Sequence, residues 1–335
     1  MSDALTSLLA QRDWLLTDGA TGTNLFNMGL EAGEAPELWN VDRPDAIRAL
    51  YRGSVDAGSD LFLTNTFGGN ASRLALHQAS DRVEELNRAG AALAREVADA
   101  SGREVVVAGS IGPTGEIMAP MGSLTREAAA DLFEAQAEGL REGGVDILWV
   151  ETLSAGEELE AAAEAIRRTG MPWCVTMSFD TAGRTMMGLT GSDLVRLVTA
   201  LPHPPIAFGA NCGVGASDLL RTVLGIAAQG PELPIIAKGN AGIPKFVEGH
   251  IHYNGTPELM ADYARLARDC GARIIGGCCG TTPEHLVAMR RALETHEPGP
   301  KPGLDEIVER LGAFSSLSDG GEGAPERRPR RRRRG

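Results

Sequence analysis

Aromatic residues are scarce in this chain of 335 residues, since phenylalanine, tryptophan and tyrosine together make up 4%. So few rings leave little material for an aromatic cage of the kind that binds quaternary ammonium groups. Long hydrophobic runs are absent as well, and the stretch 1–17 is interrupted by Gln11, Arg12 and Asp13. Such a stretch is typical neither of a signal peptide nor of a membrane span. We therefore expect a cytoplasmic protein that does not bind membranes.

Positive charge is also in short supply, because the formal net charge is −13. An acidic chain repels the phosphate backbone, which argues against nucleic acid as a partner. The last residues reverse this balance, since seven arginines lie between 327 and 334. We predict that 320–335 is a disordered, solvated basic tail.

The chain has five cysteines, an odd number in a long sequence. This count does not indicate a disulfide framework and favours a reducing compartment. Cys174 lies within an apolar run and Cys270 at the end of a helical stretch, so we expect both to be packing or surface residues. The other three cysteines are in a different setting, described below.

Eight short apolar runs are distributed along the chain. Their length and nearly continuous hydrophobicity are typical of strands buried on both faces of a parallel sheet. The runs are Trp14–Thr17, Leu61–Thr64, Val105–Ala108, Ile147–Val150, Trp173–Met177, Ile206–Phe208, Ile235–Ala237 and Arg273–Ile275.

Stretches rich in alanine, glutamate and arginine separate these runs and carry apolar residues at the three- and four-residue spacing of helices. They include Pro44–Ala57, Asp81–Ala100, Arg126–Glu142, Ala155–Thr169, Ser192–Leu201, Ala216–Ala228 and Pro257–Asp269. Eight alternations of strand and helix favour an α/β fold of the (β/α)8 TIM-barrel type over a doubly wound open sheet. We assign 1–296 to the barrel, 297–319 to an extension with a short helix at Asp305–Leu311, and 320–335 to the tail.

Polar residues and glycines concentrate directly after nearly every apolar run. In a (β/α)8 barrel the active site lies at the carboxyl ends of the strands, so these turns are the candidate site. They are Asp18–Thr23, Asn65–Asn70, Gly109–Gly115, Glu151–Thr152, Gly209–Gly215, Lys238–Gly242 and Gly276–Thr281.

Three cysteines lie in these turns: Cys212 after the sixth run, and Cys278 and Cys279 after the eighth. Three thiolates with a fourth, open position are typical of catalytic zinc. Adjacent strand residues point to opposite faces, so the pair can reach one metal only if the flanking glycines let the backbone bend. Small core residues and a vicinal disulfide are the alternatives, and we favour the metal.

Two acidic residues, Asp18 and Glu151, follow apolar runs and belong to the same rim. Either alone is compatible with a structural hydrogen bond to loop amides. Together they could hold the ammonium group of a ligand. Asn211, beside Cys212, could orient a ligand or satisfy its own turn.

Four motifs are specific enough to compare with a known family: Asp-Gly-Ala-Thr-Gly-Thr at 18–23, Asn-Thr-Phe at 65–67, Gly-Ala-Asn-Cys-Gly at 209–213 and Gly-Gly-Cys-Cys-Gly-Thr at 276–281. With them the chain resembles the homocysteine S-methyltransferase family from about Leu15 to Ala292. The resemblance implies a (β/α)8 barrel with Zn2+ held by three cysteines. The ligands and substrate contacts that it implies are Cys212, Cys278 and Cys279 for zinc, Asp18, Glu151, Asn65 and Asn211 for homocysteine, and the backbone at Gly19, Ala20 and Thr21 for its carboxylate.

Further likeness within the family concerns the methyl donor. The runs Gly29–Asn40 and Thr181–Gly188, like the basic tail, resemble bacterial stand-alone betaine–homocysteine S-methyltransferases. This predicts betaine as donor, with dimethylglycine released, and Trp39, Phe67 and Thr152 as a donor pocket. The turns also resemble the homocysteine module of cobalamin-dependent methionine synthase, for which the donor is a corrinoid protein. S-methylmethionine or another sulfonium compound is a third candidate donor.

The expected chemistry follows from the acidity of thiols. A free thiol has a pKa near 8.5, so only a few per cent is thiolate at pH 7. Coordination to zinc deprotonates a thiol, so homocysteine sulfur in the fourth position would attack a methyl group without a general base. We thus expect homocysteine and a small-molecule donor as partners, and the sequence does not exclude an oligomer. A zinc-bound thiol sensor without catalysis is the alternative from another class.

Overall fold

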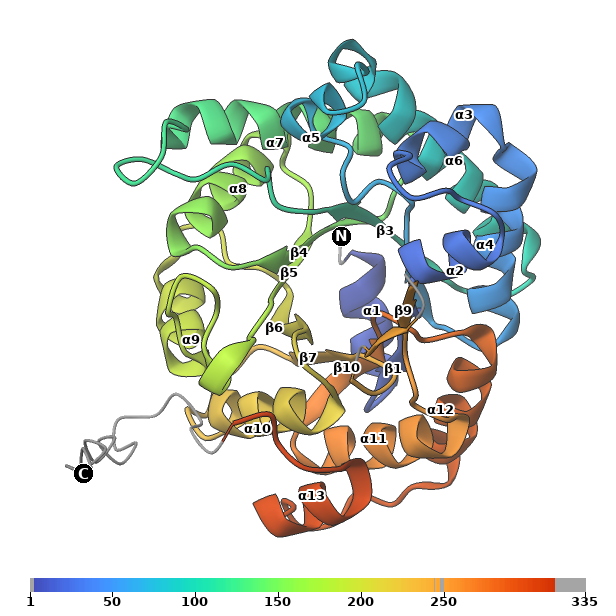
Figure 1. The fold of residues 1–335 in the computed structure, drawn as a ribbon, viewed down its shortest axis with the longest axis vertical. Coiled ribbons are helices and arrows are strands. Elements are labelled where there is room, and N and C mark those ends of the chain that lie inside the picture. Colours follow the sequence, from blue (N-terminus) through green and yellow to red (C-terminus); the bar gives the residue numbers. More distant parts are fainter. Residues whose placement is uncertain (1–2, 244, 248–249, 317–335) are drawn as a thin grey trace, which may run out of the picture.

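The computed structural model describes residues 3–243, 245–247 and 250–316. Within them, eight parallel strands form one sheet in the order β1-β10-β7-β6-β5-β4-β3-β2, which curls into a ring (Figure 1). The (β/α)8 prediction is confirmed, and each predicted run contains or overlaps one strand. The strands are β1 Leu15–Leu16, β2 Leu61–Leu63, β3 Val106–Ile111, β4 Ile147–Leu153, β5 Trp173–Met177, β6 Ala207–Cys212, β7 Ile235–Gly239 and β10 Ala272–Gly277. The predicted tail at 320–335 lies outside the described residues.

An outer ring of helices surrounds the strands (Figure 1). Hydroxyl caps start several of these helices; Thr125 and Thr256, for example, accept hydrogen bonds from the amides of Ala128 and Leu259. The principal helices are α4 Pro44–Asp56, α6 Val83–Ala100, α7 Arg126–Glu142, α8 Gly156–Thr169, α9 Gly191–Ala200, α10 Ala216–Ala227, α11 Pro257–Asp269 and α12 Pro283–Thr295, followed by α13 Leu304–Leu311. None of the described helices has both the length and the apolar character that crossing a bilayer requires.

Shorter elements fill the turns at the carboxyl ends of the strands. They are α2 Gly22–Asn27, η1 Pro36–Leu38 and α3 Trp39–Asp42 after β1, α5 Ala71–Ala75 and η2 Ser80–Arg82 after β2, η3 Thr181–Gly183 after β5, and the antiparallel pair β8 Lys245–Val247 and β9 His250–His252 after β7. These insertions surround the mouth of the barrel.

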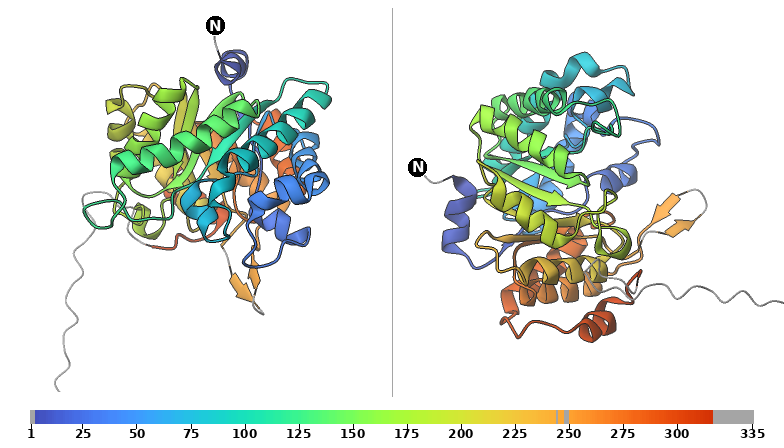
Figure 2. Two further views of the ribbon diagram at one scale, coloured as in Figure 1. Left: turned by 90° about the horizontal axis from the view of Figure 1, so that it is seen from above. Right: turned by 90° about the vertical axis from the view of Figure 1, so that its left-hand side faces the viewer.

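Helix α1, Ala4–Gln11, closes the opposite end of the barrel. Its side chains Leu5 and Leu8 are fully buried against residues that point into the barrel, among them Leu15 and Trp149. Figure 2 shows α1 at one end of the molecule and the β8–β9 hairpin at the other. The amino-terminal end is therefore filled with apolar side chains, and only the carboxyl end is left for a polar site.

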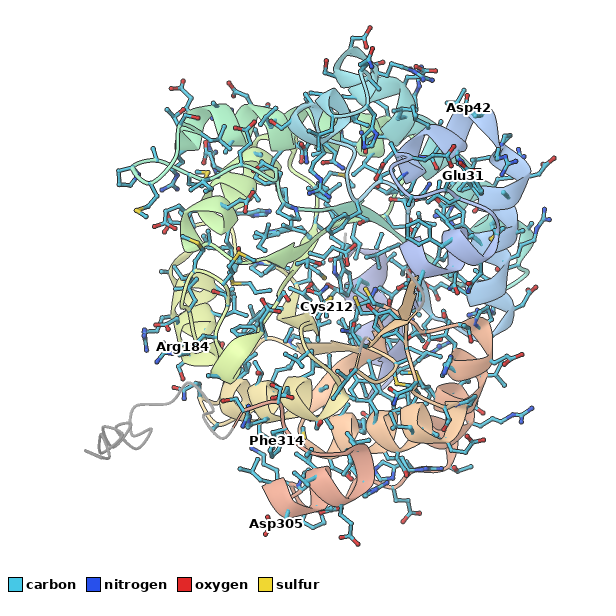
Figure 3. All side chains as sticks on the ribbon, in the orientation of Figure 1. Glu31, Asp42, Arg184, Cys212, Asp305 and Phe314 are labelled. Carbon is cyan, nitrogen blue, oxygen red and sulfur yellow. The ribbon has the colours of Figure 1, made fainter. Side chains whose placement is uncertain are left out.

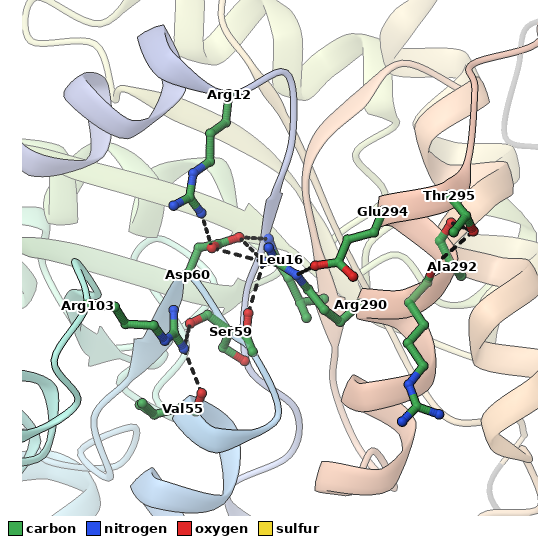
Figure 4. Close-up of polar contacts among 12 residues, drawn as sticks. Arg12, Leu16, Val55, Ser59, Asp60, Arg103, Arg290, Ala292, Glu294 and Thr295 are labelled. Atoms are coloured by element: carbon green, nitrogen blue, oxygen red, sulfur yellow. Dashed lines mark hydrogen bonds and ion pairs between the residues drawn. The ribbon is translucent and has the colours of Figure 1, made fainter.

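The ring closes between β1 and β2 through Asp60, which is 1% exposed. The amide of Asp60 donates to the carbonyl of Leu16 (2.7 Å), and the Leu16 amide donates to the Asp60 carboxylate (2.8 Å). Arg12 and Arg290 pair with the same carboxylate, as Figure 4 shows. β1 is only two residues long, so its backbone makes few hydrogen bonds to a neighbouring strand. The Asp60 side chain supplies hydrogen bonds that the backbone of a longer strand would make.

Candidate metal and substrate site

Three cysteine sulfurs meet at the mouth of the barrel. Cys212 ends β6, and Cys278 and Cys279 directly follow β10. Their Sγ atoms all lie within 4.8 Å of one another, and those of Cys212 and Cys279 are 4.0 Å apart. Figure 3 places Cys212 near the centre of the ring of strands. In a tetrahedral zinc site with Zn–S bonds of about 2.3 Å, neighbouring sulfurs are about 3.8 Å apart, so this donor set fits zinc.

The backbone bends that the cysteine pair requires are present. The Cys278 amide still donates to the Gly239 carbonyl of β7 (2.7 Å), as a strand residue would, and the chain then turns. Gly280, with φ +78°, completes that turn, and a Cβ there would lie 2.3 Å from the ring of Tyr253. Cys212 itself has φ +59°, a left-handed conformation that non-glycine residues adopt infrequently. Such conformations cluster at functional sites, where surrounding contacts hold them.

Asn211 connects the sulfurs to the fourth strand. Its Nδ2 group lies 3.8 Å from the Cys278 sulfur and donates to the Thr152 hydroxyl (2.8 Å), and its Oδ1 accepts from the Thr152 amide (3.1 Å). Thr152 has φ +65°. The side-chain amide of Asn211 therefore contacts the Cys278 sulfur and also holds the backbone of Thr152 in its left-handed conformation.

Two further contacts to the cysteines were not predicted from the sequence. The Asn240 Oδ1 atom accepts from the Cys279 amide (3.1 Å), and its Nδ2 donates to the Gly213 carbonyl (2.9 Å). The side chain of Tyr253 is hydrogen-bonded to the Cys279 thiol. Asn240 lies in one of the polar turns, so a signal existed, whereas nothing in the sequence marks Tyr253.

The thiols are close enough to influence one another's ionisation. The hydrogen bond with Cys278 raises the pKa of Cys212 to about 12, and burial adds to it. The hydrogen bond with Cys212 raises the pKa of Cys279 to about 11, again with burial. Such thiols ionise at neutral pH only when a cation lies among them, so metal binding at this site releases protons.

An Asn211→Asp variant is expected to bind zinc roughly 10- to 100-fold more weakly than the unaltered protein. The change preserves shape but removes the Nδ2 donor to Cys278 and places a negative charge beside the thiolates. Competition with a chromophoric zinc chelator measures the affinity. Thr152→Val is the control, because it removes the hydroxyl that Asn211 also contacts and leaves the amide–sulfur contact in place. Equal affinities for Asn211→Asp and the unaltered protein would contradict this role.

Of the two predicted acidic residues, Asp18 is the more enclosed and accepts three hydrogen bonds. It is 4% exposed. Its Oδ1 accepts from the Lys238 ammonium (2.7 Å) and the Thr17 hydroxyl (2.8 Å), and its Oδ2 accepts from the Leu63 amide (2.9 Å). Lys238, on β7, is buried and was not among the predicted site residues.

Glu151 on β4 is half-buried, and its Oε1 accepts from the Ser110 hydroxyl (2.6 Å). No described residue donates to its other oxygen. Burial raises the pKa of Glu151, and the charge of Lys238 opposes that shift. Burial lowers the pKa of Lys238, but the carboxylates of Asp18 and Glu151 outweigh it and raise that pKa above its ordinary value. The two acids and the lysine therefore form one electrostatic group.

The first predicted turn interlocks with the cysteine turn. The Ala20 amide donates to the Thr281 carbonyl (3.1 Å), and a Cβ on Gly19 would lie 2.7 Å from that same oxygen. Thr21 precedes the short helix α2, and the hydroxyl of Thr23 accepts from the Gly280 amide. The contact of this backbone with a substrate carboxylate stays a prediction.

Asn65 is 1% exposed, and its amide donates to the Pro36 carbonyl (2.8 Å) and to Asn40 Oδ1 (3.0 Å). These bonds join the end of β2 to the insertion that carries Trp39. Its predicted contact with the substrate likewise stays a prediction. The hydrogen bonds of its side chain are with other residues of the protein.

The two aromatic rings of the predicted donor pocket each face an arginine. The Trp39 side chain is buried, and the Arg43 guanidinium lies 4.5 Å from its ring centroid. The Arg73 guanidinium lies 5.8 Å from the ring of Phe67. Among the described residues, no hydrogen bond or ring–cation contact connects either ring to the cysteines, whereas Thr152 is connected to Cys278 through Asn211.

Comparison with known proteins gives concordant results. A family profile described as homocysteine S-methyltransferase matches residues 15–293. The methionine synthase of Mycobacterium tuberculosis is 31% identical over 306 residues, which cover 86% of this chain and 25% of that protein. The methionine synthase of Mycobacterium leprae is 29% identical over 330 residues, covering 93% and 27%. The chain thus spans about a quarter of the length of these relatives.

Among solved structures, the metallated form of the homocysteine methyltransferase MmuM from Escherichia coli superposes with a TM-score of 0.71 at 26% identity. The match covers 86% of this chain and 99% of that one. The residues matched by the family profile, 15–293, include the strands and all three clustered cysteines. With the profile spanning the whole barrel, the chain belongs to the homocysteine S-methyltransferase family.

Proposed function

We propose that this protein is a zinc-dependent methyltransferase that transfers a methyl group to the sulfur of homocysteine and forms methionine. The observation that carries the proposal is the cluster of three cysteine sulfurs within 4.8 Å at the barrel mouth. Three thiolates leave one ligand position for the thiol of a substrate. A zinc ion held by Cys212, Cys278 and Cys279 would supply the positive charge that favours the thiolate form of that substrate.

The protein's own residues account for the rest of the site. One oxygen of Glu151 has no donor among the described residues, which suits it to the α-ammonium group of homocysteine. Asn211 holds Cys278 in place, and the three cysteines are partly exposed, so a substrate thiol can reach them. No side chain acts as a base during methyl transfer, because the attacking sulfur is already deprotonated.

The donor that we propose is betaine, as the sequence resemblance implies. The thiolates and two carboxylates around one lysine make the site negative, which favours a donor whose methyl group is on a cationic centre. Betaine and sulfonium compounds both meet this requirement. Trp39, Phe67 and Thr152 remain the proposed donor pocket.

Methionine formation by the zinc-loaded protein tests the proposal. Homocysteine is supplied with betaine, with a dimethylsulfonium compound, or with a methylated corrinoid protein. We expect turnover with betaine alone, its loss after a chelator removes zinc, and its return when zinc is restored. Binding of zinc and homocysteine without methionine formation from any donor would instead identify a thiol sensor.

One observation favours a corrinoid protein as the second candidate donor. Among the described residues, all but one of the exposed large apolar side chains lie on segments that follow a strand and surround the mouth. The exception is Leu304, and the others are Phe26, Met28, Val41, Leu76, Ile117, Met121, Met186, Met187 and Ile243. Exposed apolar side chains mark a protein interaction site when they form a contiguous patch, which is what a docked corrinoid protein would require of these residues. Transfer from the methylated corrinoid protein, with none from betaine, would establish this candidate.

A further inference from the structure

The three clustered cysteines are within reach of a methyl donor. Cys212, Cys278 and Cys279 are each partly exposed. If the proposed function holds, all three are thiolates in the working protein, and the sulfur of homocysteine is a fourth. The thiolate is the nucleophilic form of a cysteine. A methyl donor that enters the mouth therefore meets four nucleophiles, and only one of them is the substrate.

Methylation of one of the protein's own cysteines would damage the site. The Sγ atom would form a bond to the methyl carbon, the carbon–nitrogen bond of a quaternary ammonium donor would break, and its electron pair would stay on the nitrogen. The product, S-methylcysteine, is a neutral thioether and no longer the thiolate that binds a metal. Because burial does not protect the cysteines, another feature of the site must direct the methyl group to homocysteine.

Each of the three cysteine sulfurs is hydrogen-bonded to a side chain of its own. The pairs are Asn211 with Cys278, Asn240 with Cys212, and Tyr253 with Cys279. A thiolate has no proton to give, so the amide or the phenol is the donor in every pair. The second Nδ2 hydrogen of each amide is bonded elsewhere, that of Asn211 to the Thr152 hydroxyl and that of Asn240 to the Gly213 carbonyl. These donors therefore serve the cysteines and leave no hydrogen for a substrate sulfur.

Tyr253 is held in place by its surroundings. It directly follows β9, and its ring packs so closely on Gly280 that a Cβ there would lie 2.3 Å from it. Two residues further on, the Gly255 amide donates to the Ala241 carbonyl (2.8 Å), which fixes the chain beside the end of β7. The contact of the phenol with Cys279 is thus supported from both sides.

On the basis of the proposed function, we propose that Tyr253 is a positioning residue whose hydroxyl suppresses methylation of Cys279, so that the methyl group goes to homocysteine. A hydrogen bond to a thiolate stabilises its charge and makes the sulfur a weaker nucleophile. Asn211 and Asn240 act in the same way on the other two sulfurs. Both amides also hold backbone groups of the site, so Tyr253 is the donor whose removal changes least else.

The test compares the unaltered protein with Tyr253→Phe, both loaded with zinc and free of homocysteine. They are treated with methyl iodide, a small methylating agent that needs no donor pocket, and zinc content is measured before treatment. Fragment-ion mass spectrometry follows S-methylcysteine separately at the adjacent Cys278 and Cys279. Tyr263→Phe is the matched control, because it removes a phenol that lies close to the backbone of Gly239 and is hydrogen-bonded to no cysteine.

We expect Cys279 to be methylated roughly 3- to 10-fold faster in Tyr253→Phe, since thiolate nucleophilicity follows about half of the change in basicity that a hydrogen bond to a charged group causes. Cys212 and Cys278 should react at unchanged rates and serve as internal references. Tyr263→Phe should match the unaltered protein at all three cysteines. During turnover with homocysteine and a donor, Tyr253→Phe should lose zinc progressively as Cys279 becomes methylated.

Two outcomes would overturn the inference. An unchanged rate at Cys279 would show that the phenol does not protect it, and an equal rise at all three cysteines would show that Tyr253 only keeps the site compact. Failure of the proposed function has a separate sign. The unaltered zinc-loaded protein would then form no methionine from any donor, which is read in the methionine assay and not in the methylation of Cys279.

Discussion

A Cys278→Ala variant is expected to lose stoichiometric zinc and with it the formation of methionine. Cys278 is a prospective ligand and also the sulfur that Asn211 contacts, so its removal leaves two thiols that cannot complete the site. The fall in activity should far exceed the roughly 100-fold that loss of an outer contact to a metal ligand causes. Metal analysis of the purified protein and a methionine assay measure the two effects.

Cys174→Ala is the matched control for that variant. Cys174 is buried inside the barrel beneath the site and packs among apolar side chains such as Trp149 and Ile236. Its loss leaves a small cavity but removes no ligand, so zinc content should stay stoichiometric. Full activity with stoichiometric zinc in Cys278→Ala would rule out the three-cysteine assignment.

The strands were predictable because strands buried on both faces read as continuous apolar runs. The run Ile147–Val150, for example, extends in β4 to Leu153 and so includes Glu151 and Thr152. Helix α1 was not expected, since eight residues with three buried leucines give too short a pattern to recognise. The closure through Asp60 was not expected either, because it depends on contacts with Arg12 and Arg290 that are far apart in the sequence.

The cysteine cluster was predictable for a local reason. The glycines beside Cys278 and Cys279 indicate a bend, and the fold brings the turn of Cys212 to the same end. The pairing of Lys238 with Asp18 was not predictable, because the two residues lie 220 positions apart in the sequence. Only the order of the strands in the sheet brings them together. The setting of Trp39 was not predictable either, because its residue type does not show that the short helix α3 buries the ring.

An Asp60→Ala variant is expected to lower the free energy of unfolding by about 1–3 kcal/mol, the usual cost of leaving a buried donor without its acceptor. The change leaves the Leu16 amide without its carboxylate acceptor and deprives Arg12 and Arg290 of their shared partner. It therefore opens the ring where β1 and β2 meet. Urea unfolding followed by circular dichroism measures the loss.

Asp45→Ala tests whether burial is the cause. Asp45 also pairs with an arginine, Arg48, but its side chain is 98% exposed. Exposed pairs contribute at most about 1 kcal/mol, so this variant should unfold almost like the unaltered protein. Asp60 lies at the end of the barrel away from the cysteines, so folded Asp60→Ala protein should still bind zinc. Equal stability of the two variants would mean that the β1–β2 closure does not depend on this carboxylate.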